Sequence, residues 1–417
     1  MRLTALEEGF LCNGLPETIG AAALFTGDPF DLAELRARVG ERWGALERMS
    51  RLPEPSRTAA LLGHRWSAPA PFDAAVHVTA CAQELEPLLT ASVTRRLPTD
   101  RPLWHLLVPE PTPSGEQPLL LLAHHALLDG SSLLTLLRLL MDDLRTRPPA
   151  PLATPPRERP RVPAATLLKE WRDSNARGRH LPLAPGEPQA SVAVARLDPD
   201  VMRSARRRPS TGRGATLNEL LLGAFAGALP TCYDALASPA DGDTPLFATV
   251  PMDLRARHET DDLGNLITAI RVPLPLGADT PAGRLHACQH LLAALQERSR
   301  AHHVVLPILE GVTRVAPWLT ATLARRIARP EVTTAVCTAF KWRDGPSRLH
   351  GRRLNGIVTL PALSPPGTAN LGLAQHGDTY LLTVVSHLRP ADSRLIADTV
   401  AKELTAMAFE GARQPIA

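Results

Sequence analysis

The segment LLAHHALLDGSS at residues 121–132 contains side chains that could carry out acid–base chemistry. His124 and His125 are adjacent, and Asp129 and Gly130 follow after three apolar residues. A neutral imidazole can take a proton from an alcohol or an amine, and the resulting nucleophile can attack an acyl thioester without a covalent enzyme intermediate. The segment therefore predicts a histidine general base.

The two histidines end a continuous apolar run, PLLLLAHH, which is typical of a strand buried on both faces. Neighbouring side chains on a strand point to opposite faces, so we expect one histidine to face a cavity and the other to pack into the domain. This geometry also argues against a metal site built on both histidines, and no metal is expected.

Asp129 and Gly130 allow two interpretations. Asp129 or Ser131 can cap the following helix while Gly130 supplies an unusual backbone angle. Alternatively, Asp129 fixes the loop through an ion pair with an arginine, and Gly130 keeps the approach to the histidine clear. A second histidine pair, His302 and His303, lacks the Asp-Gly spacing, and we expect it at a helix start or on the surface.

Other catalytic motifs are missing from the sequence. It contains no GxSxG nucleophile elbow, no Walker-type phosphate loop and no HExxH zinc motif. The histidine segment is therefore the candidate reaction centre.

The rest of the chain must position this segment, and its sequence shows helix patterns and strand patterns in turn. In the first half we expect a strand ending at the histidines and a helix from Ser131 to about Arg145. The other expected elements of that half are a helix at 31–49, short strands around 73–80, a helix at 85–96 and a strand at 103–109. In the second half we expect helices at 216–229, 281–299, 305–328 and 391–408, and strands at 246–255, 267–276 and 379–388.

The segment 148–163 is rich in proline and cannot continue a helix, so we interpret it as a crossover between two α+β domains. The predicted domains are residues 1–163, which include this linker, and residues 164–417. A chain of 417 residues also favours two domains on length alone.

The amino-acid composition excludes several classes of protein and of binding partner. Hydrophobic residues make up 44% and charged residues 21%, which is typical of a globular chain, and the net charge is +4. The basic segment 203–215 has no interleaved aromatics, so no nucleic-acid partner is expected. Five scattered cysteines argue against a disulfide framework or a zinc site and favour the cytoplasm. The sequence has no signal peptide and no apolar run of the ~20 residues that a membrane span needs.

The motif HHxxxDG is the signature of a superfamily that contains thioester-dependent acyltransferases and the condensation domains of nonribosomal peptide synthetases. Within it, the chain resembles the bacterial wax ester synthase/diacylglycerol acyltransferase family. LTALEEGFL at residues 3–11 is similar to the family's opening segment. Further similar motifs follow in the family's order over most of residues 1–300: Pro102-Leu103-Trp104, Asn218, Pro251 with Arg255, and Gly264-Asn265. Asn218 matches the family's Asn-Asp motif, but Glu219 replaces the aspartate.

The resemblance implies an α+β (α/β) fold of two chloramphenicol-acetyltransferase-like domains that form a V-shaped pseudo-dimer with a central tunnel. It implies that His125 is the general base and that His124, Asp129 and Gly130 shape the active site. Trp104, Asn218, Arg255 and Asn265 are supporting candidates, although each could equally be structural. No cofactor is expected.

The implied reaction transfers an acyl group from acyl-CoA or acyl carrier protein to a hydroxyl acceptor, giving an ester. The acceptor classes are a specialised metabolite, a fatty alcohol or a diacylglycerol, and a peripheral membrane contact is compatible with the last two. Two alternatives stay open: a stand-alone condensation enzyme that forms an amide, and a catalytically silent homologue that binds an acyl or carrier ligand.

The C-terminal half departs from the family pattern. Residues 335–354 stand where the family has an Asn-x-Pro-Gly-Pro segment, and its later Ser-Tyr-x-Gly stretch is not recognisable near residues 372–382. These departures favour a specialised metabolite as the acceptor.

Overall fold

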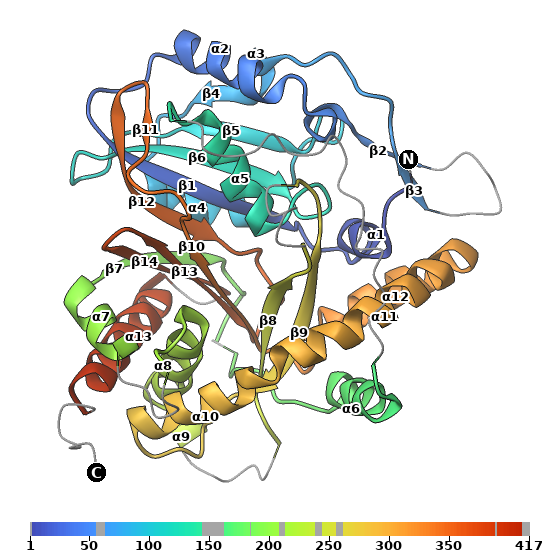
Figure 1. Cartoon of the computed structure of the whole chain (residues 1–417), viewed down its shortest axis with the longest axis vertical. Coiled ribbons are helices and arrows are strands. Elements are labelled where there is room, and N and C mark those ends of the chain that lie inside the picture. Colours follow the sequence, from blue (N-terminus) through green and yellow to red (C-terminus); the bar gives the residue numbers. More distant parts are fainter. Residues whose placement is uncertain are drawn as a thin grey trace.

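A computed structural model describes residues 2–55, 63–143, 162–183, 185–207, 213–237, 244–255, 262–387 and 390–410. Within these residues the strands form two six-stranded sheets and one two-stranded sheet, and each large sheet is the centre of a lobe (Figure 1). All but the last two residues of the proline-rich segment 148–163 lie outside the described residues.

The sheet of the first lobe has the strand order β11-β12-β1-β6-β5-β4. Its strands in chain order are β1 (Thr18–Thr26), β4 (Val78–Ala80), β5 (Trp104–Val108), β6 (Gln117–His124), β11 (Arg348–Leu349) and β12 (Arg352–Leu360). The pair β4 and β5 is parallel, and the other neighbours are antiparallel. β1 lies between β6 and β12, so a strand from late in the chain completes the sheet that carries the histidines.

Helices cover both faces of this first sheet. α2 and α5 contact one another, and α5 packs on β1, whereas α4 reaches β1 and also the second lobe's β7. The remaining elements of this lobe are α1 (Ala5–Cys12), α2 (Leu32–Trp43), a 3-10 helix (Glu47–Ser50), β2 (Pro53–Pro55), β3 (His64–Trp66), α3 (Ala74–His77), α4 (Leu85–Thr94) and α5 (Gly130–Leu140).

The sheet of the second lobe has the strand order β7-β14-β13-β10-β8-β9. Its strands are β7 (Ser191–Leu197), β8 (Phe247–Asp253), β9 (Ile267–Pro273), β10 (Ala335–Lys341), β13 (Ala369–His376) and β14 (Thr379–Ser386). β10 runs parallel to both β8 and β13, and the other pairs are antiparallel.

α8 and α13 pack together against this second sheet, and α11 and α12 extend from it towards α1 (Figure 1). The helices of this lobe are α6 (Ala164–Asn175), α7 (Pro199–Arg207), α8 (Leu217–Cys232), α9 (Asp234–Ala237), α10 (Pro281–Ala293), α11 (Leu295–Val315), α12 (Pro317–Ile327) and α13 (Pro390–Glu410). No helix in the described part of the chain is both long enough and apolar enough to cross a bilayer.

Several of the sequence-based element predictions were wrong in detail. The short strands expected around 73–80 begin as helix α3, because the Asp73 side chain accepts a hydrogen bond from the amide of Ala75 and caps that turn. The helix expected at 31–49 ends at Trp43, and the helix expected from Ser131 to about Arg145 ends at Leu140. The interval 300–304, expected between two helices, lies inside α11. The helices break instead at Ala294, between α10 and α11, and before Pro317, which begins α12.

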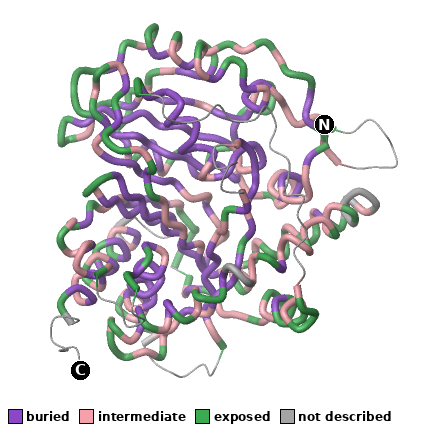
Figure 2. The backbone as a smooth tube through the Cα atoms, in the orientation of Figure 1, coloured by how far each residue is buried: buried purple, intermediate pink, exposed green. Residues whose placement is uncertain are grey.

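The buried side chains form one core in each lobe and a third between the lobes. Figure 2 shows that the buried residues are concentrated in the strands of the two large sheets. The third core joins Leu24 of β1 and Val358 of β12 to Leu381 and Val385 of β14. The two lobes therefore share apolar packing. The division into domains between residues 163 and 164 stays a prediction. β11 and β12 follow this division in the chain, but they belong to the sheet of the first lobe.

Candidate active site

His125 lies immediately after β6, at the start of a turn that leads into α5. Its backbone N–H donates to the carbonyl oxygen of Glu17 at 2.7 Å, which fixes the turn to the chain that precedes β1. The ring lines a large cavity between the lobes, while His124 is not among the residues that line it. The two histidines thus face different surroundings, although β6 ends at His124 and His125 belongs to the turn.

Two contacts hold the His125 ring. The ring of Phe10 in α1 stacks on it with centroids 4.0 Å apart and an interplanar angle of 11°. On its edge, Nδ1 lies 3.2 Å from Oδ1 of Asn265. The ring is therefore oriented by one residue from each lobe.

The Asn265 amide determines which tautomer of His125 is present. Its Nδ2 donates to the carbonyl oxygens of His125 at 2.5 Å and Ala126 at 3.0 Å, so its Oδ1 is the atom that faces the ring. An amide oxygen can only accept a hydrogen bond, so Nδ1 of His125 carries the proton. Nε2 is then unprotonated, as a general base requires.

The electrostatic setting also keeps His125 neutral. Burial lowers its pKa below the ordinary histidine value, and the opposing influence of backbone hydrogen bonds, of Asp129 and of Asn265 is smaller. Burial likewise lowers the pKa of His124 to about 4, assisted by His125 and Arg96. His124 Nδ1 accepts the amide N–H of Ala126 at 3.1 Å, which makes it a structural part of the turn.

Asp129 acts on the architecture of the site. It begins α5, where its Oδ1 accepts the amide N–H of Ser132 at 2.8 Å. Its Oδ2 accepts the amide N–H of Leu266 at 3.0 Å and lies 2.9 Å from Nη1 of Arg255. Both side chains of this ion pair are almost fully buried. Asp129 therefore satisfies both sequence interpretations, because it caps the helix and pairs with an arginine.

Gly130 lies beside the cavity, at a close contact between the two lobes. A Cβ built on Gly130 would lie 2.5 Å from Cζ of Phe340 in β10, a separation that real side chains do not adopt. The residue also lines the cavity. A larger residue at this position would therefore have to displace the ring of Phe340, which packs against the glycine from the second lobe.

The remaining candidates divide between the site and the cores. Asn265 and Arg255 contact His125 and Asp129, as described above. Trp104 is buried in the first lobe, where its Nε1 donates to the carbonyl oxygen of Met49 at 2.8 Å and its ring stacks on His77. Asn218 lies in the first turn of α8, away from the cavity-lining residues.

The second histidine pair lies inside α11, not at its start, and the expectation of a helix-start position was wrong. His302 Nε2 lies 3.0 Å from Oε1 of Glu170, and Arg298 binds the same carboxylate. This charged cluster links α11 to α6, so His302 is partnered outside the candidate site.

The cavity beside His125 has a volume of about 790 Å³, within the range of roughly 300–1,000 Å³ typical of small-molecule sites. Its walls come from both lobes, namely α1, β1 and α5 on one side and β8, α11, α12 and β10 on the other. Apolar side chains dominate these walls, including Leu6, Ile19, Leu134, Leu306 and Leu323. The base therefore faces a space suited to an aliphatic chain.

Three residues at the site were not found from the sequence. Phe10 and Phe340 belong to different elements, and only the fold brings their rings to His125 and Gly130. Glu17 is buried at the cavity wall with a backbone φ of 50°, and burial raises its pKa to about 7. Glu17 lies between α1 and β1 in the chain, and its local sequence carries no signal that separates it from a surface glutamate.

Comparison with known proteins agrees with this geometry. The model of the wax ester synthase/diacylglycerol acyltransferase catalytic domain matches residues 14–216, which confirms the resemblance over that part of the chain. A probable diacylglycerol O-acyltransferase of Mycobacterium tuberculosis is 30% identical over 223 residues, which are 46% of this chain and 48% of the relative. The chain thus spans about half the length of the curated relatives it matches.

Solved structures show the same fold over nearly the whole chain. A wax ester synthase/diacylglycerol acyltransferase from Marinobacter aquaeolei is 17% identical with a TM-score of 0.64, covering 99% of this chain and 100% of that one. The first condensation domain of the CDA synthetase is 15% identical with a TM-score of 0.67, covering 99% of this chain and 98% of that one. The expected mixed α/β fold of two acyltransferase-like lobes is confirmed.

Proposed function

We propose that this chain, whose N-terminal half matches the wax ester synthase/diacylglycerol acyltransferase catalytic domain, is an O-acyltransferase that uses His125 as its general base. One observation carries the proposal: the Asn265 oxygen accepts the hydrogen bond of Nδ1–H, which leaves Nε2 of His125 unprotonated in a residue that lines the apolar cavity.

The reaction follows from this tautomer. Nε2 of His125 takes the proton of an acceptor hydroxyl while the oxygen attacks the carbonyl carbon of an acyl thioester. The tetrahedral adduct collapses, the C–S bond breaks, and the imidazolium returns its proton to the departing thiolate. The products are an ester and a free thiol, and His125 is again neutral.

The donor and acceptor classes follow from the cavity and from the relatives. We propose a donor with an aliphatic acyl chain, carried on coenzyme A or on an acyl carrier protein, because the walls on both sides of His125 are apolar. The named activity of the relatives favours an alcohol acceptor such as a diacylglycerol, a fatty alcohol or a specialised metabolite. We propose a cytoplasmic setting, since free cysteines suit a reducing compartment.

The test measures thiol release and product mass from a panel of acyl-CoA donors, each offered an alcohol or an amine of matched chain length. We expect esters from the full chain, and His125→Ala should lower the rate by about 10²–10⁴-fold. His303→Ala, in the second histidine pair, is the matched control and should retain the rate.

A folded His125→Ala protein with the full rate would contradict the assigned base. Amide products without esters would contradict the O-acyltransferase assignment and support the condensation alternative.

A further inference from the structure

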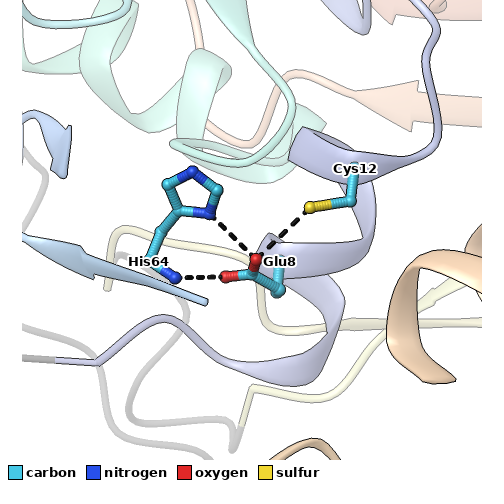
Figure 3. Close-up of side chains that lie close together, drawn as sticks. All are labelled: Glu8, Cys12 and His64. Atoms are coloured by element: carbon cyan, nitrogen blue, oxygen red, sulfur yellow. Dashed lines mark hydrogen bonds and ion pairs between the residues drawn. The ribbon is translucent and has the colours of Figure 1, made fainter. Parts of the chain in front are cut away.

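A second cluster of reactive side chains lies beside the cavity wall, on a different face of α1. Glu8 and Cys12 are one helical turn apart on α1, and His64 lies opposite them on β3 (Figure 3). The face of α1 that lines the cavity carries Leu6 and Phe10 instead. The cluster is therefore separate from the chemistry proposed for His125.

Glu8 holds the three side chains together. Its Oε1 lies 2.9 Å from Nδ1 of His64 and accepts from Sγ of Cys12 at 3.3 Å. Its Oε2 accepts the backbone N–H of His64 at 2.9 Å, which orients the carboxylate independently of the two side chains. One ligand atom from each residue lies within 4.8 Å of the other two. This is a compact, preorganised set of three donors.

We propose that Glu8, Cys12 and His64 form a binding site for one zinc ion. A thiolate, an imidazole and a carboxylate are the three ligand types that Zn²⁺ accepts at ~2.0–2.3 Å, and water would complete a tetrahedron. The sulfur and nitrogen donors disfavour Mg²⁺ and Ca²⁺, which prefer oxygen ligands. Cys12 and His64 both retain exposed surface, so an ion can reach the donors from solvent.

Binding exchanges protons for the metal. The Cys12 thiol loses its proton to the solvent as the Zn–S bond forms. Nδ1 of His64 binds the ion as neutral imidazole, so its proton moves through solvent to Nε2, or leaves to the solvent where the ring was imidazolium. The thiolate and the Glu8 carboxylate together balance the two positive charges of the ion. The cluster can therefore hold Zn²⁺ without a buried net charge.

The spacing of the cysteines argued against a zinc site, because no CxxC pair is present. That expectation considers only ligands that are close in sequence. Here one helical turn of α1 aligns Glu8 with Cys12, and β3 supplies His64, which lies 52 residues after Cys12 in the chain. The ion would tie α1 to β3. Since α1 also carries Phe10, metal binding would stabilise the helix that stacks on His125.

The experiment titrates the reduced full-length protein with Zn²⁺ by calorimetry and, in parallel, with Co²⁺ by absorption spectroscopy. We expect one tight site per chain, a thiolate-to-cobalt charge-transfer band, and a higher melting temperature with metal. Cys12→Ser should remove the band and weaken binding at least tenfold. Cys81→Ser, at another half-exposed cysteine, is the matched control and should leave both unchanged.

A second control addresses surface histidines. His286 and His290 lie one turn apart on α10 with their Nε2 atoms 3.0 Å apart, and such a pair can bind Zn²⁺ adventitiously. Loss of tight binding in His290→Gln together with retention in Cys12→Ser would overturn the proposal, as would the absence of a tight site in the wild-type protein.

Glu8→Gln serves as a further variant if Cys12→Ser does not fold by circular dichroism. It should weaken Zn²⁺ binding at least tenfold, and unchanged binding would overturn the proposal. The readout does not depend on acyl transfer, so failure of the proposed function leaves this test intact.

Discussion

At the scale of single residues, Asn265 holds the proposed base, His125, in one tautomer. The HHxxxDG spacing led to His125 as the predicted base, and the Gly-Asn segment that carried the family resemblance contained its hydrogen-bond partner, Asn265. The reason that Asn265 matters was not visible in the sequence. It depends on two backbone carbonyls, at His125 and Ala126, that fix the direction of the amide.

Glu17 gives a pH-dependent prediction at this scale. Burial raises its pKa from 4.5 to about 7, so between these values the folded chain holds a proton that the unfolded chain has released. Its contribution to the free energy of unfolding therefore falls as pH rises through this window. Glu17→Gln should remove this pH dependence, and at pH 8 its free energy of unfolding should exceed that of the wild type by up to about 3 kcal/mol.

The measurement is urea unfolding of wild type and Glu17→Gln at pH 5 and pH 8. Glu187→Gln, at an exposed position, is the control and should follow the wild-type pH dependence. Equal pH slopes for wild type and Glu17→Gln would show that Glu17 titrates normally in the folded state.

At the scale of elements, the ion pair of Asp129 and Arg255 joins the first turn of α5 to the chain that follows β8. The same carboxylate binds the amide of Leu266 ahead of β9. The placement of α5, and with it the turn of His125, thus depends on a charge pair between the lobes. Removal of one partner would leave the other charge buried without compensation.

We expect Arg255→Met to lower the free energy of unfolding by about 3–5 kcal/mol, because Asp129 would stay buried without its cation. Denaturant unfolding at pH 7.5 measures the change. Arg203→Met removes an exposed arginine that pairs with Asp200 and Asp378, and it should change the stability little. A similar small effect for Arg255→Met would mean that the pair does not stabilise the fold.

The elements also show where sequence patterns fail. β1, with the sequence TIGAAALFT, was not predicted, because alanine and glycine are poor strand formers. The fold needs small residues there, since a Cβ on Gly20 would lie 2.9 Å from Cδ2 of Leu122. By contrast β6, α5 and α8 were predicted, because their apolar patterns and capping residues are local.

At the scale of the whole molecule, the two lobes were predictable but their connection was not. Length, alternating elements and the proline-rich segment indicated two α+β halves. Nothing in the local sequence of residues 352–360 indicates that they pair with β1, more than 300 residues earlier. Strand order is a tertiary property, and here it places C-terminal chain in the first sheet.

This connection predicts that residues 1–163 do not fold alone. Without β12, the fragment would expose one edge of β1 and the apolar side chains that pack on β14. We expect a fragment of residues 1–163 to lack a cooperative urea transition, and co-expression with residues 164–417 to restore it. Tryptophan fluorescence and circular dichroism would report the transition, and a cooperative fragment with native stability would contradict this expectation.

The position of β12 also limits how new enzymes can be made from this scaffold by recombination. A chimera that exchanges halves at the proline-rich segment would pair β1 of one parent with a foreign β12, across a register that runs from Gly20 to Thr26. A compatible exchange must carry residues 348–360 with the first half. The first lobe is therefore encoded by two separate stretches of the coding sequence. Recombination preserves the sheet that carries the histidines only if both stretches come from the same parent.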